Sequence, residues 1–526
     1  MKDEPGDRTT RQGRLWENLS LRDRLGLVAR LRQTIALVQE EIARTVAEET
    51  GKPVTEVLSQ EVTATLEMLK YFETKYPRQL RPRRFRCWRP GFWRKTNAIV
   101  LEPLGTIGLI GPANFPFSLP VVTAASSLLC GNRVVFKPSE KCPLTARLIG
   151  RLFRESDFPG SAFEIVAGGE DAAREVIGRA AVRKVIFFGG YEAGRKVAAL
   201  CGRDFKPCIL ELGGSGTAIV RADADLRRAA RGLVWSAFYA AGRSCVGTKI
   251  AHVHASAMDR LAWLLVEEMF KLRTGEALDP ATDVGTSSEE EMPPLVQRFL
   301  GDAQEGGTIV RGAGGATLVV LDAPDSARPR LPEGDIAWPL LVVCPVGSDE
   351  EAVRAANASA YGLGASIWSG DRKKAQAMAG MLQASLIWVN DASVGLPQAP
   401  WGGAKRSGWG RLFSESAISE LTSTKVVSVE NARSAKRRFW WFPYSRKKYG
   451  LLVAVNALVY GKQRLKILFS LFKSRAAHGL KPRPVVSGRQ GIPLPQDGQD
   501  VLSTNLRARG PSMTILDEKE ARGGRP

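Results

Sequence analysis

Residues 13–76 carry apolar side chains at helical spacing. In NLSLRDRLGLVARLRQTIALVQEEIARTVAEET, which ends at Thr50, apolar residues recur every three or four positions among charged ones. Gly51 and Pro53 interrupt this pattern, and VTEVLSQEVTATLEMLKYFETKY then resumes it. The chain is therefore expected to begin with a layer of helices.

From Asn97 onward the pattern changes to short apolar runs that end in glycine or proline. The runs are AIVLEPLGTIGLIGP, RVVFKPS, FEIVAGG, KVIFFGG and CILELGG, and helical stretches follow most of them. This alternation is typical of a parallel sheet with crossover helices, so the predicted fold class is α/β. A second block of this kind covers about residues 215–411, where WSAFYAAG predicts a helix closed by Gly242. Ligand-binding residues are expected at the carboxyl ends of the strands, where the glycines lie.

The C-terminal part of the chain is basic and aromatic. Residues 431–490 contain fifteen Lys or Arg and no Asp or Glu. Their apolar run, Leu451 to Tyr460, is ten residues long, and a helix needs about twenty to cross a bilayer. Such a segment can lie in the interface of an anionic membrane, or it can dock on the protein itself or across a subunit contact. Nucleic acid is the least favoured anionic partner. Residues 78–95 share this composition and suggest an exposed hairpin or connector, whereas the sequence beyond Pro482 predicts disorder.

Length and composition limit the kinds of domain, partner and catalytic group that the chain can be expected to have. A chain of 526 residues predicts two or three domains, and its net charge of +21 points to anionic partners. The seven cysteines are scattered without a CxxC pair, and there are only three histidines, so we expect neither a disulfide framework nor a metal site. Acid–base work should then fall to carboxylates. The N-terminus lacks the apolar run of a secretory signal, which predicts a cytoplasmic protein.

Four short motifs carry candidate chemistry. GPANFPFSLP places Asn114 on a loop after an apolar strand, where its amide can donate to an oxyanion, although asparagine in such loops is more often a turn residue. RVVFKPSE places Lys137 and Glu140 at a strand end, where they can bind ribose or phosphate oxygens or be merely solvated. FFGGYEAG puts adjacent glycines at a strand-to-helix turn suited to a pyrophosphate, without the GxGxxG pattern. LELGG and GRSCVG contribute Glu211 and Cys245; a lone cysteine is usually a buried hydrophobe, but this one follows a helix in a loop of small residues.

Taken together, these motifs resemble the aldehyde dehydrogenase superfamily. PANFP, FKPSE, FFGGYEAG, LELGG, GRSCVG, YGLGASIW and PWGGAKRSGWGR occur in that family's order over roughly residues 15–430. The resemblance implies two doubly wound α/β domains, one for the cofactor and one catalytic, with a small β oligomerisation arm. The implied boundaries are 1–85 and 105–211 for the dinucleotide-binding domain, 212–411 for the catalytic domain, and 86–104 and 412–430 for the arm. The basic aromatic extension then covers 431–480 and a disordered tail 481–526.

The same resemblance implies a role for each site residue. Cys245 would attack the aldehyde carbonyl, Asn114 and the Cys245 amide would stabilise the oxyanion, and Glu211 would activate water to hydrolyse the thioester. Glu211 favours a free acid as product and Glu140 favours NAD over NADP, while a homodimer or tetramer and an apolar or long-chain aldehyde are further expectations. The implied cofactor-binding residues are Lys137, Ser139, Glu140, Phe188, Gly189, Gly190, Gly194, Leu212 and Asp335. A catalytically weak scaffold that binds an anionic partner is the alternative function.

The sequence departs from the family pattern at several site positions. Ala113 stands where Trp is frequent, Arg243 where Gln is frequent, and Gly190 where Ser or Thr is common. In EGDIAWPLLVV, Asp335 takes the place of a Glu that binds the nicotinamide ribose, and Ala337 and Trp338 replace Phe and Gly. The shorter carboxylate implies a looser grip on the ribose, and the Arg243 cation would lower the pKa of Cys245 if the two side chains converge.

Overall fold

A computed structural model describes residues 16–87, 95–285, 292–322, 334, 336–392, 395–431 and 441–461. Its contacts divide the chain into a unit of residues 1–432 and a unit of residues 433–526. Asp335 is the predicted cofactor-binding residue that lies outside the described residues. All of residues 462–526, including the predicted tail, also lie outside them.

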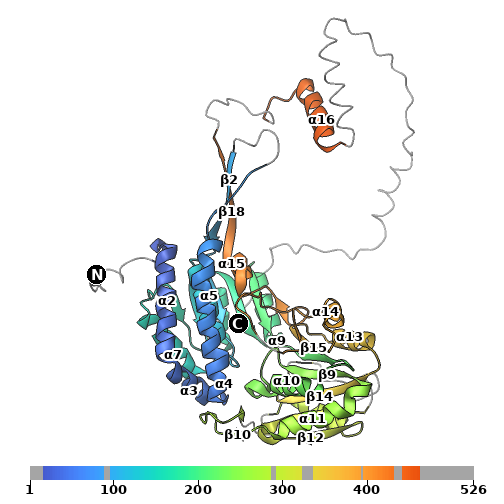
Figure 1. The fold of residues 1–526 in the computed structure, drawn as a ribbon. Helices are drawn as coiled ribbons and strands as arrows, with labels where there is room; N and C mark the ends of the chain where they lie inside the picture. The colour runs from blue at the N-terminus through green and yellow to red at the C-terminus, as the bar shows by residue number, and fades with distance from the viewer. Residues whose placement is uncertain are drawn as a thin grey trace, which may run out of the picture. The chain divides into compact units, whose positions relative to one another are not determined.

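Helices form the first layer, as the apolar spacing predicts. They are α2 (Leu21–Leu37), α3 (Gln39–Thr50), α4 (Val54–Val57), the π-helical η2 (Leu58–Thr63) and α5 (Ala64–Gln79), after a short η1 (Trp16–Asn18). Ser20 begins α2 with a capping box that it shares with Asp23, and Gly51 ends α3 in a left-handed conformation with φ 67°. Their buried apolar residues pack against the crossover helices of the first half of the chain and share one core cluster with its sheet, and Figure 1 shows α2 and α5 side by side in this layer.

A six-stranded sheet forms the core of the first half of the chain. Its order is β17 (Gly408–Trp409), β7 (Cys208–Leu212), β6 (Val182–Gly189), β3 (Thr106–Ile110), β4 (Arg133–Lys137) and β5 (Phe163–Ile165). All neighbours are parallel except β17, which runs antiparallel to β7. The crossover helices are α6 (Ser118–Leu129), α7 (Pro143–Glu155), α8 (Glu170–Gly178) and α9 (Tyr191–Arg203). The chain leaves β3 toward β4 and later returns to its other side as β6, which makes a topological switch point where ligands bind.

A seven-stranded sheet forms the second half. Its order is β12 (Gly307–Arg311), β13 (Thr317–Leu321), β14 (Leu340–Val346), β9 (Thr248–His254), β8 (Gly216–Val220), β15 (Gly364–Trp368) and β16 (Leu386–Val389), parallel except for β12. The helices around it are α10 (Leu226–Phe238), α11 (Met258–Phe270), α12 (Pro294–Ala303), α13 (Asp349–Ala358) and α14 (Arg372–Ala379). A small parallel pair, β10 (Thr274–Gly275) and β11 (Val284–Gly285), lies beside it.

A third, antiparallel sheet joins distant parts of the chain. Its strands are β1 (Arg83–Phe85), β2 (Lys95–Pro103) and β18 (Thr422–Glu430), the last preceded by α15 (Ser414–Leu421). The strands β2 and β18 form a long ribbon (Figure 1). The apolar run that begins at Ala98 is thus divided between two sheets, because the chain turns at Gly105 (φ 125°) between β2 and β3.

The second unit contains the helix α16 (Arg446–Tyr460), which Ser445 caps through its hydroxyl. Asn456 interrupts its apolar run, which is therefore not continuous from Leu451 to Tyr460. Within the described residues, the helices are all too short or too polar to span a bilayer.

Candidate active site

A cleft of about 520 Å³ opens at the carboxyl ends of β3, β4, β6 and β7. Cys245, which comes from the loop before β9, also reaches it. Most of the residues predicted from the sequence line this cleft: Asn114, Lys137, Ser139, Glu140, Phe188, Gly189, Gly190, Glu211, Leu212 and Cys245. The fold thus brings together residues that are up to 131 positions apart along the chain, since Asn114 and Cys245 both border the cleft.

Lys137 and Glu140 form an ion pair at the end of β4. The Nζ of Lys137 lies 2.7 Å from Oε2 of Glu140, with the lysine nearly buried and the glutamate side chain 59% exposed. The hydrogen bond from Lys137 lowers the pKa of Glu140 below its ordinary value. Glu140 is therefore a carboxylate at neutral pH and presents its charge to the cleft.

Glycines keep the turn between β6 and α9 open for a phosphate. Gly190 is the N-cap of α9, and it has no side chain that could accept hydrogen bonds from the N–H groups of the first turn. These N–H groups are therefore available to an anion. A Cβ at Gly189 would collide with the ring of Phe187. Gly194 lies one turn into α9, where a Cβ would meet Leu212. These features, with Lys137 and Glu140, fit a bound dinucleotide.

Glu211 lies near the end of β7 and is only 6% exposed. Its Oε1 atom has no hydrogen-bond partner among the described residues. Burial raises the pKa of this carboxyl to about 8, and the charge of Arg411 opposes the rise. A carboxyl with a pKa near neutrality, at the edge of a cleft, is suited to general acid–base work.

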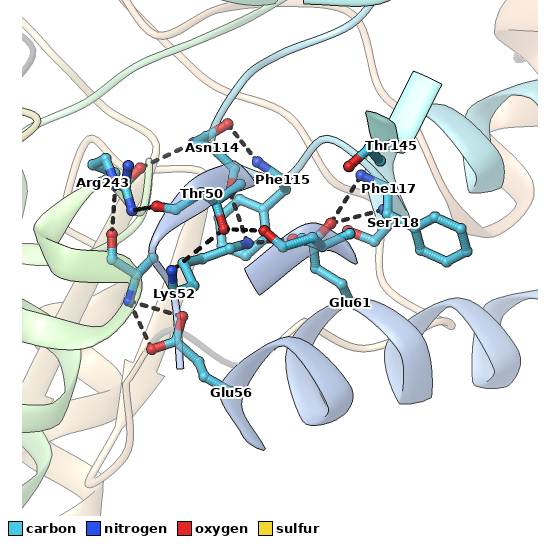
Figure 2. A network of polar contacts seen from close by, with 12 residues as sticks. Thr50, Lys52, Glu56, Glu61, Asn114, Phe115, Phe117, Ser118, Thr145 and Arg243 are labelled. Carbon is cyan, nitrogen blue, oxygen red and sulfur yellow. Dashed lines mark hydrogen bonds and ion pairs between the residues drawn. The ribbon is translucent and has the colours of Figure 1, made fainter. Parts of the chain in front are cut away.

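Asn114 and Arg243 connect the two halves of the site. The Nδ2 of Asn114 donates to the carbonyl oxygen of Arg243 at 2.9 Å, while its Oδ1 accepts from the amide of Phe115 at 3.0 Å. The guanidinium of Arg243 donates to the carbonyl oxygens of Thr50 and Ala240. The arginine beside Cys245 is thus bonded to the backbone of two neighbouring segments (Figure 2).

The loop that carries Cys245 has an unusual backbone. The helix predicted to run to Gly242 ends at Phe238, because Ala240 and Ala241 adopt left-handed conformations with φ 55° and 50°. Gly242 is also left-handed, and a Cβ there would collide with the backbone of Trp338. The buried Lys249 then donates to the carbonyl oxygens of Gly242 and Trp338 at 2.6 and 2.7 Å.

Cys245 also belongs to the lining of a second cavity, of about 310 Å³. This cavity shares Leu119 and Trp401 with the 520 Å³ cleft at the strand ends, which is called the cofactor cleft from here on. Its other large side chains are predominantly apolar: Met68, Phe115, Val122, Trp235, Tyr239, Val246, Leu396, Pro397 and Phe413. Trp235 of α10 belongs to this lining, whereas Phe238 in the same helix is packed in the core of the second half.

Sequence reasoning missed several buried polar residues around the site. Lys52 and Glu61 form an ion pair beneath the Asn114 loop, and Lys249 anchors the Cys245 loop. Lys52 stands in the Gly-Lys-Pro break between helices, which was a signal for a special position. Trp401 lies within PWGGAKRSGWGR, a motif already quoted for the resemblance, and it borders both cavities.

The comparisons with known proteins agree with this architecture. The sequence model of the aldehyde dehydrogenase family matches residues 7–427. The chain is similar to a 4,4'-diapolycopene aldehyde oxidase of Methylomonas, with 32% identity over 465 residues and 87% of each chain covered. It is also similar to an NADP(+) succinate-semialdehyde dehydrogenase of Deinococcus radiodurans, with 31% identity over 80% of this chain and 88% of that protein.

Solved structures share the fold as well. The NAD+ complex of an aldehyde dehydrogenase from Bacillus cereus has a TM-score of 0.74 at 27% identity, over 81% of this chain and 87% of that one. The predicted α/β architecture of the family is therefore confirmed, as is the expectation of NAD with NADP as alternative. The chain belongs to the aldehyde dehydrogenase family and is an enzyme that oxidises an aldehyde to the carboxylic acid with NAD or NADP.

Proposed function

We propose that this enzyme oxidises a long or otherwise apolar aldehyde to its acid with NAD, through a thioester on Cys245. The observation that carries the proposal is the predominantly apolar cavity that ends at Cys245 beside the cofactor cleft. An aldehyde whose apolar tail fills this cavity brings its carbonyl carbon to the sulfur.

In the first step, the thiolate of Cys245 attacks the carbonyl carbon and the carbonyl oxygen becomes an oxyanion. One N–H of the Asn114 amide is bonded to Arg243, so its second N–H and the backbone amide of Cys245 are the donors assigned to this oxygen. A bound nicotinamide would accept the hydride that leaves the former carbonyl carbon, so that the oxyanion collapses to a thioester on Cys245. Lys137, Glu140 and the turn before α9 would hold the dinucleotide.

In the second step, water hydrolyses the thioester. Glu211 takes a proton from the water as it attacks, and Cys245 leaves as the thiolate while the acid is released. The Oε1 atom of Glu211 has no hydrogen-bond partner among the described residues, which supports this role because a water molecule would satisfy this acceptor. The raised pKa of Glu211, about 8, makes the ionised carboxylate a stronger base toward this water than an ordinary glutamate.

The charge of Glu140 supports NAD over NADP. A carboxylate at the end of β4 accepts hydrogen bonds from ribose hydroxyls and repels a 2′-phosphate. Since both cofactors occur among similar proteins, kcat/KM with NAD and NADP decides between them. A higher kcat/KM with NADP contradicts this part of the proposal.

The similarity to the Methylomonas protein supports an apolar substrate. That protein is named for a 4,4'-diapolycopene aldehyde. The alignment with that protein covers 87% of this chain's 526 residues, which is more than the first 431 residues can contain. The similarity therefore continues into the C-terminal unit. The succinate-semialdehyde dehydrogenase covers 80% of the chain, which the family region alone can accommodate.

A panel of aliphatic aldehydes of increasing chain length, together with aromatic aldehydes, tests the reaction. The kcat/KM for NADH formation is expected to rise with the chain length of the aldehyde. NADH formation should disappear in Cys245→Ser. If the wild-type protein forms no NADH with any aldehyde, the alternative of a catalytically weak scaffold is favoured instead.

An anionic membrane surface is the partner proposed for the C-terminal unit. In α16, Arg446, Lys447 and Lys448 precede an apolar stretch, and Trp441 and Phe442 are exposed just before it. Basic residues bind anionic headgroups while aromatic rings sit at their depth. An enzyme held at the bilayer would meet apolar aldehydes where they partition.

Liposome co-sedimentation tests this partner. The full chain should pellet with anionic vesicles and remain in solution with zwitterionic ones, and a chain ending at Val429 should not pellet with either. The triple variant Arg446→Gln/Lys447→Gln/Lys448→Gln should lose much of the binding. Equal pelleting of full and shortened chains contradicts the proposal and favours docking of the segment on the protein.

The expected oligomerisation arm, residues 86–104 and 412–430, supports assembly into a homodimer or tetramer. Strand β18 lies at the edge of its sheet and exposes Val426, Val427 and Val429 by 60%, 40% and 50%. An exposed apolar edge strand is a site for pairing with another chain. Light scattering after size-exclusion chromatography measures the state, and Val426→Lys/Val429→Lys should shift it toward the monomer.

A further inference from the structure

The segment from Thr50 to Glu61 lies against both loops that form the candidate site. It includes the end of α3, the Gly-Lys-Pro break, α4 and most of the π-helical η2, up to Glu61. Figure 2 shows its polar side chains and backbone reaching the loop of Asn114 on one side and the loop before Cys245 on the other. π-helical turns are rare and often occur at functional sites.

On the first side, a buried ion pair holds the Asn114 loop. Lys52 and Glu61 are 1% and 0% exposed, and the Nζ of Lys52 donates to Oε1 of Glu61. The same Nζ donates to the carbonyl oxygen of Asn114 at 2.9 Å and lies 4.5 Å from the centre of the Phe115 ring. The backbone of Asn114 is thus fixed from below by a side chain that water does not reach.

Glu61 continues this contact into the next helix. Its Oε2 accepts from the amides of Phe117 and Ser118 at 2.9 and 3.0 Å, where α6 begins. One carboxylate therefore holds Lys52 and the start of α6 together, with Asn114 between them. Removing one partner of a buried pair leaves an uncompensated charge, so the two residues act as a unit.

On the second side, the same segment holds the Cys245 loop. Both carboxylate oxygens of Glu56 accept from the amide of Ala240, at 3.0 and 2.9 Å. The guanidinium of Arg243 donates to the carbonyl oxygen of Thr50. These contacts hold Ala240 and Ala241 in left-handed conformations, which residues with a Cβ adopt only when neighbours enforce them.

We propose that Lys52, Glu56 and Glu61 are positioning residues that set the amide of Asn114 and the thiol of Cys245 in register for attack on the aldehyde. The inference rests on the proposed roles of Asn114 and Cys245. Lys52 and Glu61 act through Asn114, and Glu56 acts through the backbone that leads to Cys245. Neither contact touches the aldehyde or the cofactor. A displacement of about 1 Å in such a pair of groups lowers the rate by roughly a hundredfold.

The double variant Lys52→Met/Glu61→Gln tests the first side. It removes both charges together and keeps the side-chain sizes and an acceptor for Phe117, so a folded protein is expected. We expect kcat/KM for the aldehyde to fall roughly tenfold to a hundredfold, with the KM for NAD unchanged within about twofold. Alkylation of Cys245 by iodoacetamide, followed by peptide mass spectrometry, should keep its wild-type rate, since alkylation needs no oxyanion donor.

A double-mutant cycle shows whether the effect passes through Asn114. In an Asn114→Ala background the same pair of substitutions should cost little further activity, because the group they position is already gone. Glu73→Gln is the matched control: Glu73 pairs with Arg32 in the same helical layer, and its loss should leave kcat/KM unchanged. Full activity in the double variant, or an equal loss in the Asn114→Ala background, overturns this part of the inference.

Two variants of Glu56 test the second side. Glu56→Ala removes the acceptor for the Ala240 amide, and we expect both kcat/KM and the alkylation rate of Cys245 to change severalfold. Glu56→Gln keeps an acceptor and should restore both. If Glu56→Ala is alkylated and turns over at the wild-type rates, the inference is overturned. If the unmodified protein forms no NADH with any aldehyde, the proposed function is overturned instead. The alkylation rates of the two proteins can still be compared in that case.

Discussion

The side chain of Leu212 lies 2.6 Å from the point where a Cβ on Gly194 would stand. The contact joins α9, whose first turn faces the cofactor cleft, to β7, which carries Glu211. A single methyl group at Gly194 would therefore disturb the phosphate turn and the strand beside it together.

Gly194→Ala should raise the KM for NAD and lower the melting temperature. The added methyl must displace Leu212, and overpacking of this kind costs about 1–3 kcal/mol. Gly202→Ala is a control in the same helix, because nothing lies within 4 Å of a Cβ there, and it should be neutral or slightly stabilising. Isothermal titration of NAD and thermal unfolding of both variants check this; equal affinities for NAD would contradict it.

The rate of thioester hydrolysis should increase with pH through about 8. Burial raises the pKa of Glu211 to about 8, so the carboxyl is largely protonated at neutral pH and cannot accept a proton from water. Above that pH it is a carboxylate and can act as the base. Rapid-mixing measurements of acyl-enzyme decay over pH give the profile. Glu211→Gln should leave the first burst of NADH and abolish this dependence; a profile unchanged in the variant would refute the assignment.

The same carboxyl should make stability depend on pH. In the unfolded chain Glu211 ionises near its ordinary value of 4.5, whereas the folded protein keeps it neutral up to about 8. Its contribution to stability is therefore present at low pH and lost as the pH rises through about 8. Relative to wild type, Glu211→Gln should raise the melting temperature more at about pH 9 than at about pH 4. An equal difference at both values would show that the site is not desolvated.

Glu140→Gln should reduce the preference for NAD. Removing the charge that Lys137 holds in the cleft lessens the repulsion of a 2′-phosphate and frees Lys137 to bind it. We expect the ratio of kcat/KM for NADP to that for NAD to increase roughly tenfold, equivalent to about 1.4 kcal/mol. Steady-state kinetics with both cofactors measure it, and an unchanged ratio would mean that Glu140 does not face the adenosine ribose.

Trp235→Ala should extend the range of aldehydes. Trp235 stacks on Tyr239 with ring centroids 4.6 Å apart and lines the apolar cavity. Both residues also border a neighbouring cavity of about 330 Å³ formed with α4 and α11, so removing the indole should connect the two. The kcat/KM of bulky aldehydes should then rise relative to short ones. Phe270→Ala, at an exposed residue outside both cavities, serves as the control.

The sequence predicted the parts of the site that depend on local pattern. Strand ends marked by glycine placed Lys137, Gly189 and Glu211 at one edge of a sheet, because parallel strands share that edge. The motifs around Asn114 and Cys245 indicated the remaining candidate groups, an oxyanion donor and a nucleophile. Local pattern and the family resemblance together thus predicted many of the residues that border the cofactor cleft, but not Trp401.

The supporting residues could not be predicted in this way. Lysine and glutamate side chains are usually solvated. The Gly-Lys-Pro break marks Lys52 as a special position but does not indicate its burial, and nothing in the local pattern distinguishes Glu61 from its exposed neighbours. Their burial depends on contacts with residues 62 and 56 positions away, Asn114 for Lys52 and Phe117 for Glu61. The helix end at Phe238 was missed for the same reason, because the left-handed Ala240 depends on Glu56.

The two cavities that meet at Cys245 share few lining residues, so the proposed aldehyde and the proposed dinucleotide would occupy separate spaces. Under the proposed mechanism, an acid formed on the sulfur can leave along the apolar side while the dinucleotide is still bound. An apolar inhibitor lodged there would compete with the aldehyde and leave the binding of NAD untouched. Changes in the apolar lining can therefore alter which aldehyde is accepted without rebuilding the half of the site that handles the cofactor.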